Sequence, residues 1–110
     1  MQYKVTVTHM AFEDEPKNVA DVDIPPAVSE GRSVLLNCNK MLSYAFKMTN
    51  HIDSDWTKND VITMLTPGSA RSTSVGDRMR LWIRKGGEGV DNVWETYGTY
   101  DVAISGFEEV

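Results

Sequence analysis

One segment of this sequence places an arginine or a tryptophan at every second position. These four residues are Arg78, Arg80, Trp82 and Arg84, and the residues between them are Met79, Leu81 and Ile83. Successive side chains of a β-strand point to opposite faces, so we expect the first set on one face and the apolar set towards a core. The first set is suited to contact phosphates and bases, or to bind a protein, because arginine and tryptophan are enriched at binding hot spots. An equally weighted alternative is that Trp82 packs under a helix or a loop.

The seven residues before this strand are rich in side chains that bond to backbone groups. Their sequence is Arg-Ser-Thr-Ser-Val-Gly-Asp, and Gly76 and Asp77 stand directly before the strand. Glycine tolerates positive φ, and aspartate, serine and threonine bond to nearby amides, so we favour a structural turn that sets the register of a hairpin. The alternative is a loop that binds an anion or a backbone. Its contact residues would be Arg71, Ser72, Ser74 and Asp77.

Other reactive side chains form no recognisable catalytic or metal-binding pattern. His51, Asp53 and Asp55 are close in sequence, but their spacing matches neither a zinc site nor a calcium loop. The single cysteine, Cys38, lies on an apolar helical stripe, so we expect a buried and unreactive thiol. We therefore name no catalytic residue, metal or cofactor, and an enzyme ranks below two kinds of binding protein.

The remaining patterns predict an α+β fold, with an antiparallel sheet of four or five strands and one main helix packed on one face. Alternation predicts strands at residues 3–8, 21–24, 61–65 and 78–84, with one or two returning strands within 93–97 and 100–104. The first two strands form a hairpin in this prediction. Ser33 is a candidate N-cap for a helix over residues 33–50, with Met41 and Met48 beside its apolar stripe. The stripe comprises Leu35, Cys38, Leu42, Ala45 and Phe46.

Size and charge limit the classes of function. The chain has 110 residues, a net charge of −5 and one cysteine, which fits a single domain over residues 1–110 without an internal disulfide. Residues 1–30 carry two lysines against six acidic side chains, whereas residues 71–85 carry five basic side chains against one aspartate. An acidic chain repels phosphate, which disfavours nucleic acid as a partner, although the basic strand is suited to an anion or an acidic partner. No secretion signal and no apolar run of ~20 residues is visible, so we expect a cytoplasmic protein without a membrane partner.

A set of short motifs follows the predicted helix. The sequence Phe-Lys-Met-Thr-Asn at 46–50 runs into His-Ile-Asp and Trp56, then come the segment 71–77 and a terminal Gly-Phe-Glu-Glu-Val. This order resembles a group of small uncharacterised phage and prophage proteins, mainly over residues 41–77 and the last few residues. The chain departs from that pattern by a longer segment that contains Gly86, Gly87 and Gly89. The resemblance implies an origin in a mobile element and supplies no catalytic residues.

The leading functional prediction is a non-enzymatic phage or prophage accessory protein that binds a host or phage protein in the host-cell cytoplasm. The alternative is a small module that binds single-stranded nucleic acid through the basic strand. Its contact residues would be Arg78, Arg80, Trp82 and Arg84. Salt-dependent binding to oligonucleotides would separate the two functions.

Overall fold

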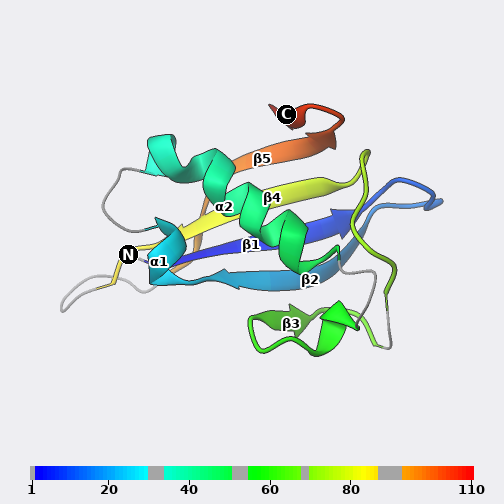
Figure 1. Cartoon of the computed structure of the whole chain (residues 1–110), viewed down its shortest axis with the longest axis horizontal. Helices are drawn as coiled ribbons and strands as arrows, with labels where there is room; N and C mark the ends of the chain where they lie inside the picture. Colours follow the sequence, from blue (N-terminus) through cyan, green and yellow to red (C-terminus); the bar gives the residue numbers. More distant parts are fainter. Residues whose placement is uncertain (1, 30–33, 51–54, 68–69, 87–92) are drawn as a thin grey trace.

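One long helix covers one face of a six-stranded antiparallel sheet (Figure 1). The computed structural model describes residues 2–29, 34–50, 55–67, 70–86 and 93–110. In chain order the elements are β1 (Gln2–His9), β2 (Lys17–Ile24), α1 (Pro26–Ser29), α2 (Val34–Met48), the 3₁₀ helix η1 (Trp56–Lys58), β3 (Ile62–Met64), β4 (Arg78–Arg84), β5 (Glu95–Ala103) and β6 (Gly106–Glu109). The predicted α+β class is confirmed, whereas the predicted number of four or five strands was too low.

The strands are ordered β3-β2-β1-β4-β5-β6, so β1 and β4 lie at the centre of the sheet. The predicted hairpin of the first two strands is confirmed, because β1 pairs antiparallel with β2. Val5 of β1 lies opposite Val22 of β2 and Leu81 of β4. This register aligns the apolar side chains of three strands, which all point towards the helix.

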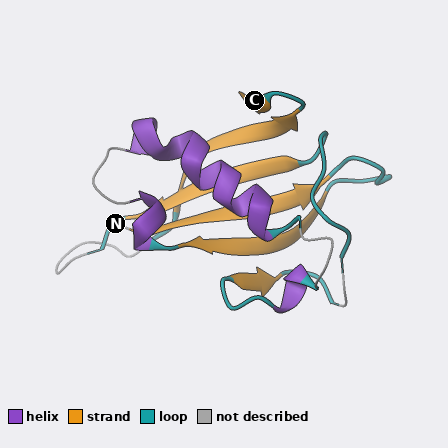
Figure 2. Cartoon of the chain, viewed as in Figure 1, coloured by secondary structure: helices purple, strands orange, loops and turns teal. Residues whose placement is uncertain are grey.

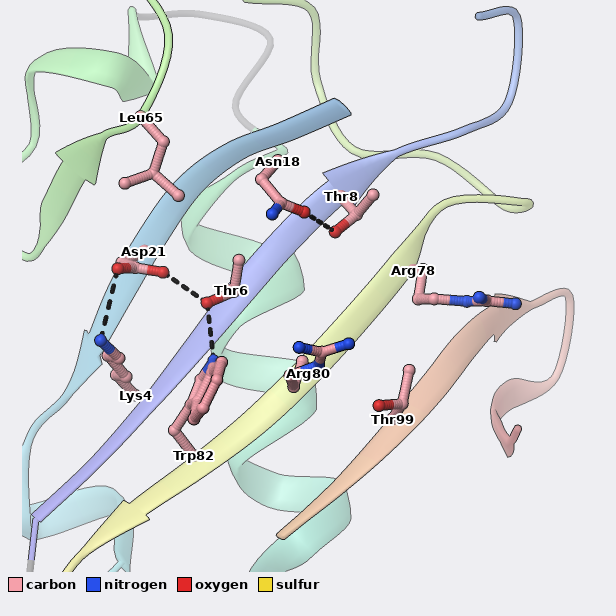
Figure 3. Close-up of a pocket in the computed structure, with 10 residues that line it drawn as sticks. All are labelled: Lys4, Thr6, Thr8, Asn18, Asp21, Leu65, Arg78, Arg80, Trp82 and Thr99. Carbon is pink, nitrogen blue, oxygen red and sulfur yellow. Dashed lines mark hydrogen bonds and ion pairs between the residues drawn. The ribbon is translucent and has the colours of Figure 1, made fainter. Parts of the chain in front are cut away.

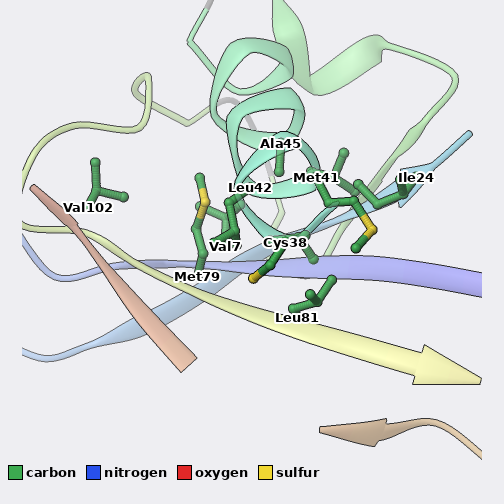
Figure 4. Close-up of a cluster of buried hydrophobic side chains, with 11 residues drawn as sticks. Val7, Ile24, Cys38, Met41, Leu42, Ala45, Met79, Leu81 and Val102 are labelled. Atoms are coloured by element: carbon green, nitrogen blue, oxygen red, sulfur yellow. The ribbon is translucent and has the colours of Figure 1, made fainter. Parts of the chain in front are cut away.

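The core lies between α2 and the sheet (Figure 4). Cys38, Leu42 and Ala45 are buried as the helical stripe predicted, and Phe46 is partly buried against the same cluster. Met41 was placed beside the stripe, but it is fully buried and belongs to it. The apolar face of the sheet opposes these residues with Val5, Val7, Met79 and Leu81. Ser33 and the side chain of Leu35 lie outside the described part of the chain.

Two segments differ from the pattern-based prediction, whereas the returning segment takes one of its two predicted forms. The returning segment is a single strand, β5, whose pairing with β4 shifts register between Leu81 and Trp82. Edge strand β6 was missed because only Phe107 is even partly buried in it, so no alternation marks it. The polar segment before β3 contains the turn η1, in which Asp55 accepts a hydrogen bond from the amide of Thr57. His51 and Asp53, the other two residues of the weighed metal pattern, lie outside the described residues.

In the described part of the chain, the helices lie on the α2 side of the sheet and none lies on the opposite face (Figure 2). We call it the open face. Its side chains include Lys4, Thr6, Thr8, Asp21, Arg78, Arg80, Trp82, Arg84, Thr99 and Asp101. The predicted alternation in β4 is confirmed, since Met79 and Leu81 are fully buried under the helix while Arg80 is exposed on the other side.

Candidate functional site: the open face of the sheet

A shallow pocket of about 240 Å³ lies on the open face, above β1 (Figure 3). Thr6 and Thr8 of β1 line it between side chains of the two neighbouring strands. Trp82 and Arg80 line it from β4, and Leu65, which is 46% exposed, lines it near the end of β3. The lining is completed by Lys4, Asn18, Asp21, Arg78 and Thr99. The pocket therefore combines an aromatic side chain, three cations, one carboxylate, an aliphatic side chain, three hydroxyls and one amide.

Trp82 is held in place by a hydrogen-bonded chain that crosses three strands. Its indole Nε1 donates to Thr6 Oγ1 at 2.8 Å, and the Thr6 hydroxyl donates to Asp21 Oδ1. Asp21 Oδ2 in turn lies 3.5 Å from Lys4 Nζ. Trp82 thus lies half-buried on the open face, away from the helix, which confirms the expectation that it shares a face with the arginines. Because its polar edge is bonded to the sheet, the orientation of the ring is set before any partner arrives.

Cations and indoles alternate across this face. Arg80 Cζ lies 5.4 Å and Lys4 Nζ lies 5.6 Å from the centroid of the Trp82 ring. Lys4 Nζ also lies 4.6 Å from the Trp94 ring, and Arg84 Cζ lies 4.7 Å from that ring. All four distances are within the range of cation–π contacts. We call the five residues, Arg80, Trp82, Lys4, Trp94 and Arg84, the cation–aromatic ladder.

Sequence reasoning missed Trp94. The residue lies just before β5, and Ile83 pairs with Glu95, so Trp94 comes next to Arg84. A tryptophan within the predicted returning strand at residues 93–97 was the available signal. It was not sufficient, because the alignment of β5 against β4 depends on a register shift that the sequence does not display.

The cations of the open face differ in how far they are already neutralised. Arg78 Nε lies 2.7 Å from Asp101 Oδ1, and Lys4 pairs with Asp21. Arg84 donates to the neutral Gln2 Oε1 through Nε at 2.7 Å and also through Nη2. Arg80 and Arg84 have no carboxylate within 4.0 Å in the part of the chain that the structure covers. The positive charge available to a partner is therefore concentrated on these two guanidinium groups.

The segment 71–77 forms a separate, internally bonded cluster. Asp77 is fully buried, and its carboxylate accepts from Arg71 Nη1 at 2.7 Å and Nη2 at 2.8 Å. It also accepts from the amides of Ser74, Met10 and Ala11 at 2.8 to 3.0 Å. Burial acts to raise the pKa of Asp77, but the bonds from Arg71 and the three amides outweigh it and lower that pKa.

Gly76 shows why this cluster needs its particular sequence. Its φ of +95° is costly for other residues, and a Cβ there would lie 3.1 Å from the Cβ of Ala11. The expected unusual geometry of Gly76 and the local amide bond to Asp77 are both confirmed. Arg71 also donates to the carbonyl oxygens of Ala11 and Ser72. Because these groups tie the segment to the β1–β2 turn, we assign the cluster a structural role and exclude it from the proposed binding surface.

A buried histidine adjoins the same cluster. His9 Nε2 lies 3.3 Å from Thr73 Oγ1 and 3.9 Å from Asp77 Oδ2. Burial lowers the pKa of His9, although Asp77 opposes that effect. Thr73 in turn bonds to Thr49 at the end of α2 through both its amide and its hydroxyl. The histidine therefore joins β1 to the end of the helix.

The free cysteine, Cys38, is a further reactive group, and its side chain is buried. Burial raises the pKa of the Cys38 thiol, in accordance with its place in the core. No cluster of three or more His, Cys, Asp or Glu side chains suited to a metal occurs within the described residues. None of the helices in that part of the chain combines the length and apolar character needed to cross a membrane.

Comparisons with protein-family models, with curated proteins and with solved structures find no match to this chain. The resemblance to phage and prophage proteins therefore stays a prediction from short motifs.

Proposed function

We propose that this protein is a non-enzymatic binding protein of phage or prophage origin that acts in the host-cell cytoplasm. It binds a host or phage protein through the open face of its sheet. The observation that carries this proposal is Trp82, a half-buried indole on the open face of the sheet, oriented by Thr6 and flanked by Arg80. Tryptophan and arginine held in this way have the composition and rigidity of an interface hot spot.

The charges of the open face favour a protein over single-stranded nucleic acid. Arg78 and Lys4 are already paired with carboxylates of the same face, so the potential there is mixed rather than uniformly positive. Lys4 and Arg80 stand on opposite sides of the Trp82 indole (Figure 3). A nucleobase needs a free aromatic face for stacking, and here both faces of the ring are flanked by cations.

The test compares capture by the wild-type protein with capture by a double variant, Trp82→Ala with Arg80→Ala. Each protein is immobilised and exposed to lysate from phage-infected host cells. A second double variant, Lys40→Ala with Lys47→Ala, is the matched control, because it removes two exposed cations from α2 on the opposite side of the sheet. We expect the open-face variant to lose captured protein and the helix variant to retain it, with thermal melting of both close to that of the wild type.

Three outcomes would contradict the proposal. Equal capture by all three proteins would show that the open face is not the interface. Salt-dependent binding of oligonucleotides that disappears in the open-face variant would instead support the nucleic-acid alternative. A collapse in the stability of the open-face variant would show that Trp82 serves the core.

A further inference from the structure

We infer that the cation–aromatic ladder binds an extended acidic segment of the partner protein, with two carboxylates four residues apart and an apolar side chain midway between them. This inference rests on the proposed protein-binding function and adds the chemistry of the partner. The feature behind it is the placement of Arg80 and Arg84 on one strand with Trp82 between them.

The spacing of the two available arginines is set by strand geometry. The pairing of β4 with β1 is unbroken from Arg78 to Arg84, so β4 alternates regularly along the whole length. Arg80 and Arg84 are four residues apart, which corresponds to about 13 Å at about 3.3 Å per residue. Carboxylates at positions i and i+4 of an extended segment have the same separation. A helix would need about nine residues for it, since it rises only about 1.5 Å per residue.

The arginines can stack on indoles and still bind carboxylates. A guanidinium group stacks through its planar face, which leaves the N–H groups at its edge available for a bidentate contact. Arg80 is exposed and, among the described residues, contacts the Trp82 ring without a side-chain hydrogen bond, so its donors are available to a partner. Within the described part of the chain, the hydrogen bonds of the Arg84 side chain go to Gln2, a neutral and exposed side chain that a carboxylate can displace or join. Charge complementarity therefore identifies the occupant as acidic.

The position between the two arginines suits an apolar side chain. Trp82 lies there with its Nε1 already bonded to Thr6, so the part of the ring that remains exposed is carbon. In an extended segment the residue midway between the two carboxylates points to the same side as they do. An aliphatic group at that position would cover the Trp82 edge and remove apolar surface from water.

The experiment uses three capped nonapeptides as probes of the intact protein, measured by isothermal titration calorimetry at low salt. The first is Thr-Val-Glu-Thr-Leu-Thr-Glu-Val-Thr, which places both glutamates at the inferred spacing. The second replaces both glutamates by glutamine. The third has the composition of the first but places the glutamates side by side, as Thr-Val-Glu-Glu-Leu-Thr-Thr-Val-Thr.

We expect the first peptide to bind about tenfold more tightly than the second, because hydrogen bonds to charged groups are the strong ones. The third should fall between them, since only one of its carboxylates reaches an arginine.

Matched arginine variants locate the site on the protein. Arg80→Ala and Arg84→Ala should each weaken binding of the first peptide about tenfold. Arg78→Ala is the control on the same strand and face, because its guanidinium is already paired with Asp101. It should change the affinity by less than about twofold. If an arginine variant fails to fold, the comparison of the three peptides on the wild-type protein still tests whether the ladder binds two carboxylates four residues apart.

Equal affinity for the three peptides, or an equal loss in Arg78→Ala, would overturn the inference. If the open-face double variant nevertheless loses captured protein from lysate, the proposed function stands and only the acidic-segment inference fails. If decathymidylate binds and is lost in Arg80→Ala while the peptides do not bind, the ladder is a nucleic-acid surface and both fail. If the acidic peptide binds as expected but the open-face double variant still captures the protein from lysate, the ladder binds acidic segments and the proposed function fails.

Discussion

The Arg71–Asp77 pair offers a direct test of how burial sets the contribution of an ion pair. The chain contains a second arginine–aspartate pair, Arg78–Asp101, with the same closest N···O distance of 2.7 Å. The side chain of Asp77 is 0% exposed, whereas that of Asp101 is 43% exposed. Asp77→Asn and Asp101→Asn therefore make the same chemical change in two different environments.

The expected magnitudes differ by severalfold. Asparagine at position 77 would turn an NH₂ group towards donors that now bind a buried carboxylate. It would leave the partly buried Arg71 guanidinium with Glu13, at 3.5 Å, as its remaining carboxylate partner among the described residues. Breaking a buried pair in this way costs about 3–5 kcal/mol. The exposed pair contributes only about 0–1 kcal/mol, because water and salt screen it. A domain has about 5–15 kcal/mol of stability in total, so Asp77→Asn should remove a large share of it.

The assay is urea denaturation followed by far-UV circular dichroism at neutral pH, with the free energy of unfolding obtained by linear extrapolation. The pH dependence gives a second readout. Because the pKa of Asp77 is lowered in the folded state, its stabilising effect is present above the ordinary aspartate pKa of about 4 and is lost as the pH falls through the lower, folded-state value. Asp77→Asn should remove that part of the acid sensitivity. Equal losses of stability in the two variants, or a loss below about 1 kcal/mol for Asp77→Asn, would refute the reasoning.

Three further predictions concern the core, the turn and the buried histidine. Leu42→Ala should cost about 2–5 kcal/mol in chemical denaturation, because Leu42 is fully buried under the sheet; a negligible loss would contradict its assigned packing. Gly76→Ala should lower the free energy of unfolding by about 1–3 kcal/mol, because of the positive φ of Gly76 and the close Cβ of Ala11. The control Gly86→Ala, with open space around the new Cβ, should lower it clearly less. Equal melting temperatures of the two variants would refute this prediction. Burial lowers the pKa of His9, so the unfolded state binds a proton more readily and stability should fall as the pH drops below about 6.5. In His9→Gln, the melting temperature should lack this dependence on pH. An unchanged pH dependence of the melting temperature would exclude His9 as its source.

The parts of the fold that the sequence by itself determined follow from the local periodicity of apolar residues. The alternation in β4 placed Arg80 and Trp82 on the face away from the buried Leu81, and helical spacing placed Leu42 in the core. These predictions held because the side-chain period of a strand or helix is a property of the local backbone. The Gly76–Asp77 pair was likewise interpretable from residue type, since few residues other than glycine accept its backbone geometry.

Only the tertiary structure decided which separate segments meet. Asp77 bonds to the amide of Met10, 67 residues away. Lys4 of β1 contacts both the ring of Trp82 in β4 and the ring of Trp94, which lies just before β5. No local pattern encodes these contacts, because they depend on strand order and on a register shift between β4 and β5. The sequence by itself therefore determined which way the side chains of β1, β4 and α2 point. The pairing of the strands decided that four of those side chains, together with Trp94, form one cation–aromatic surface.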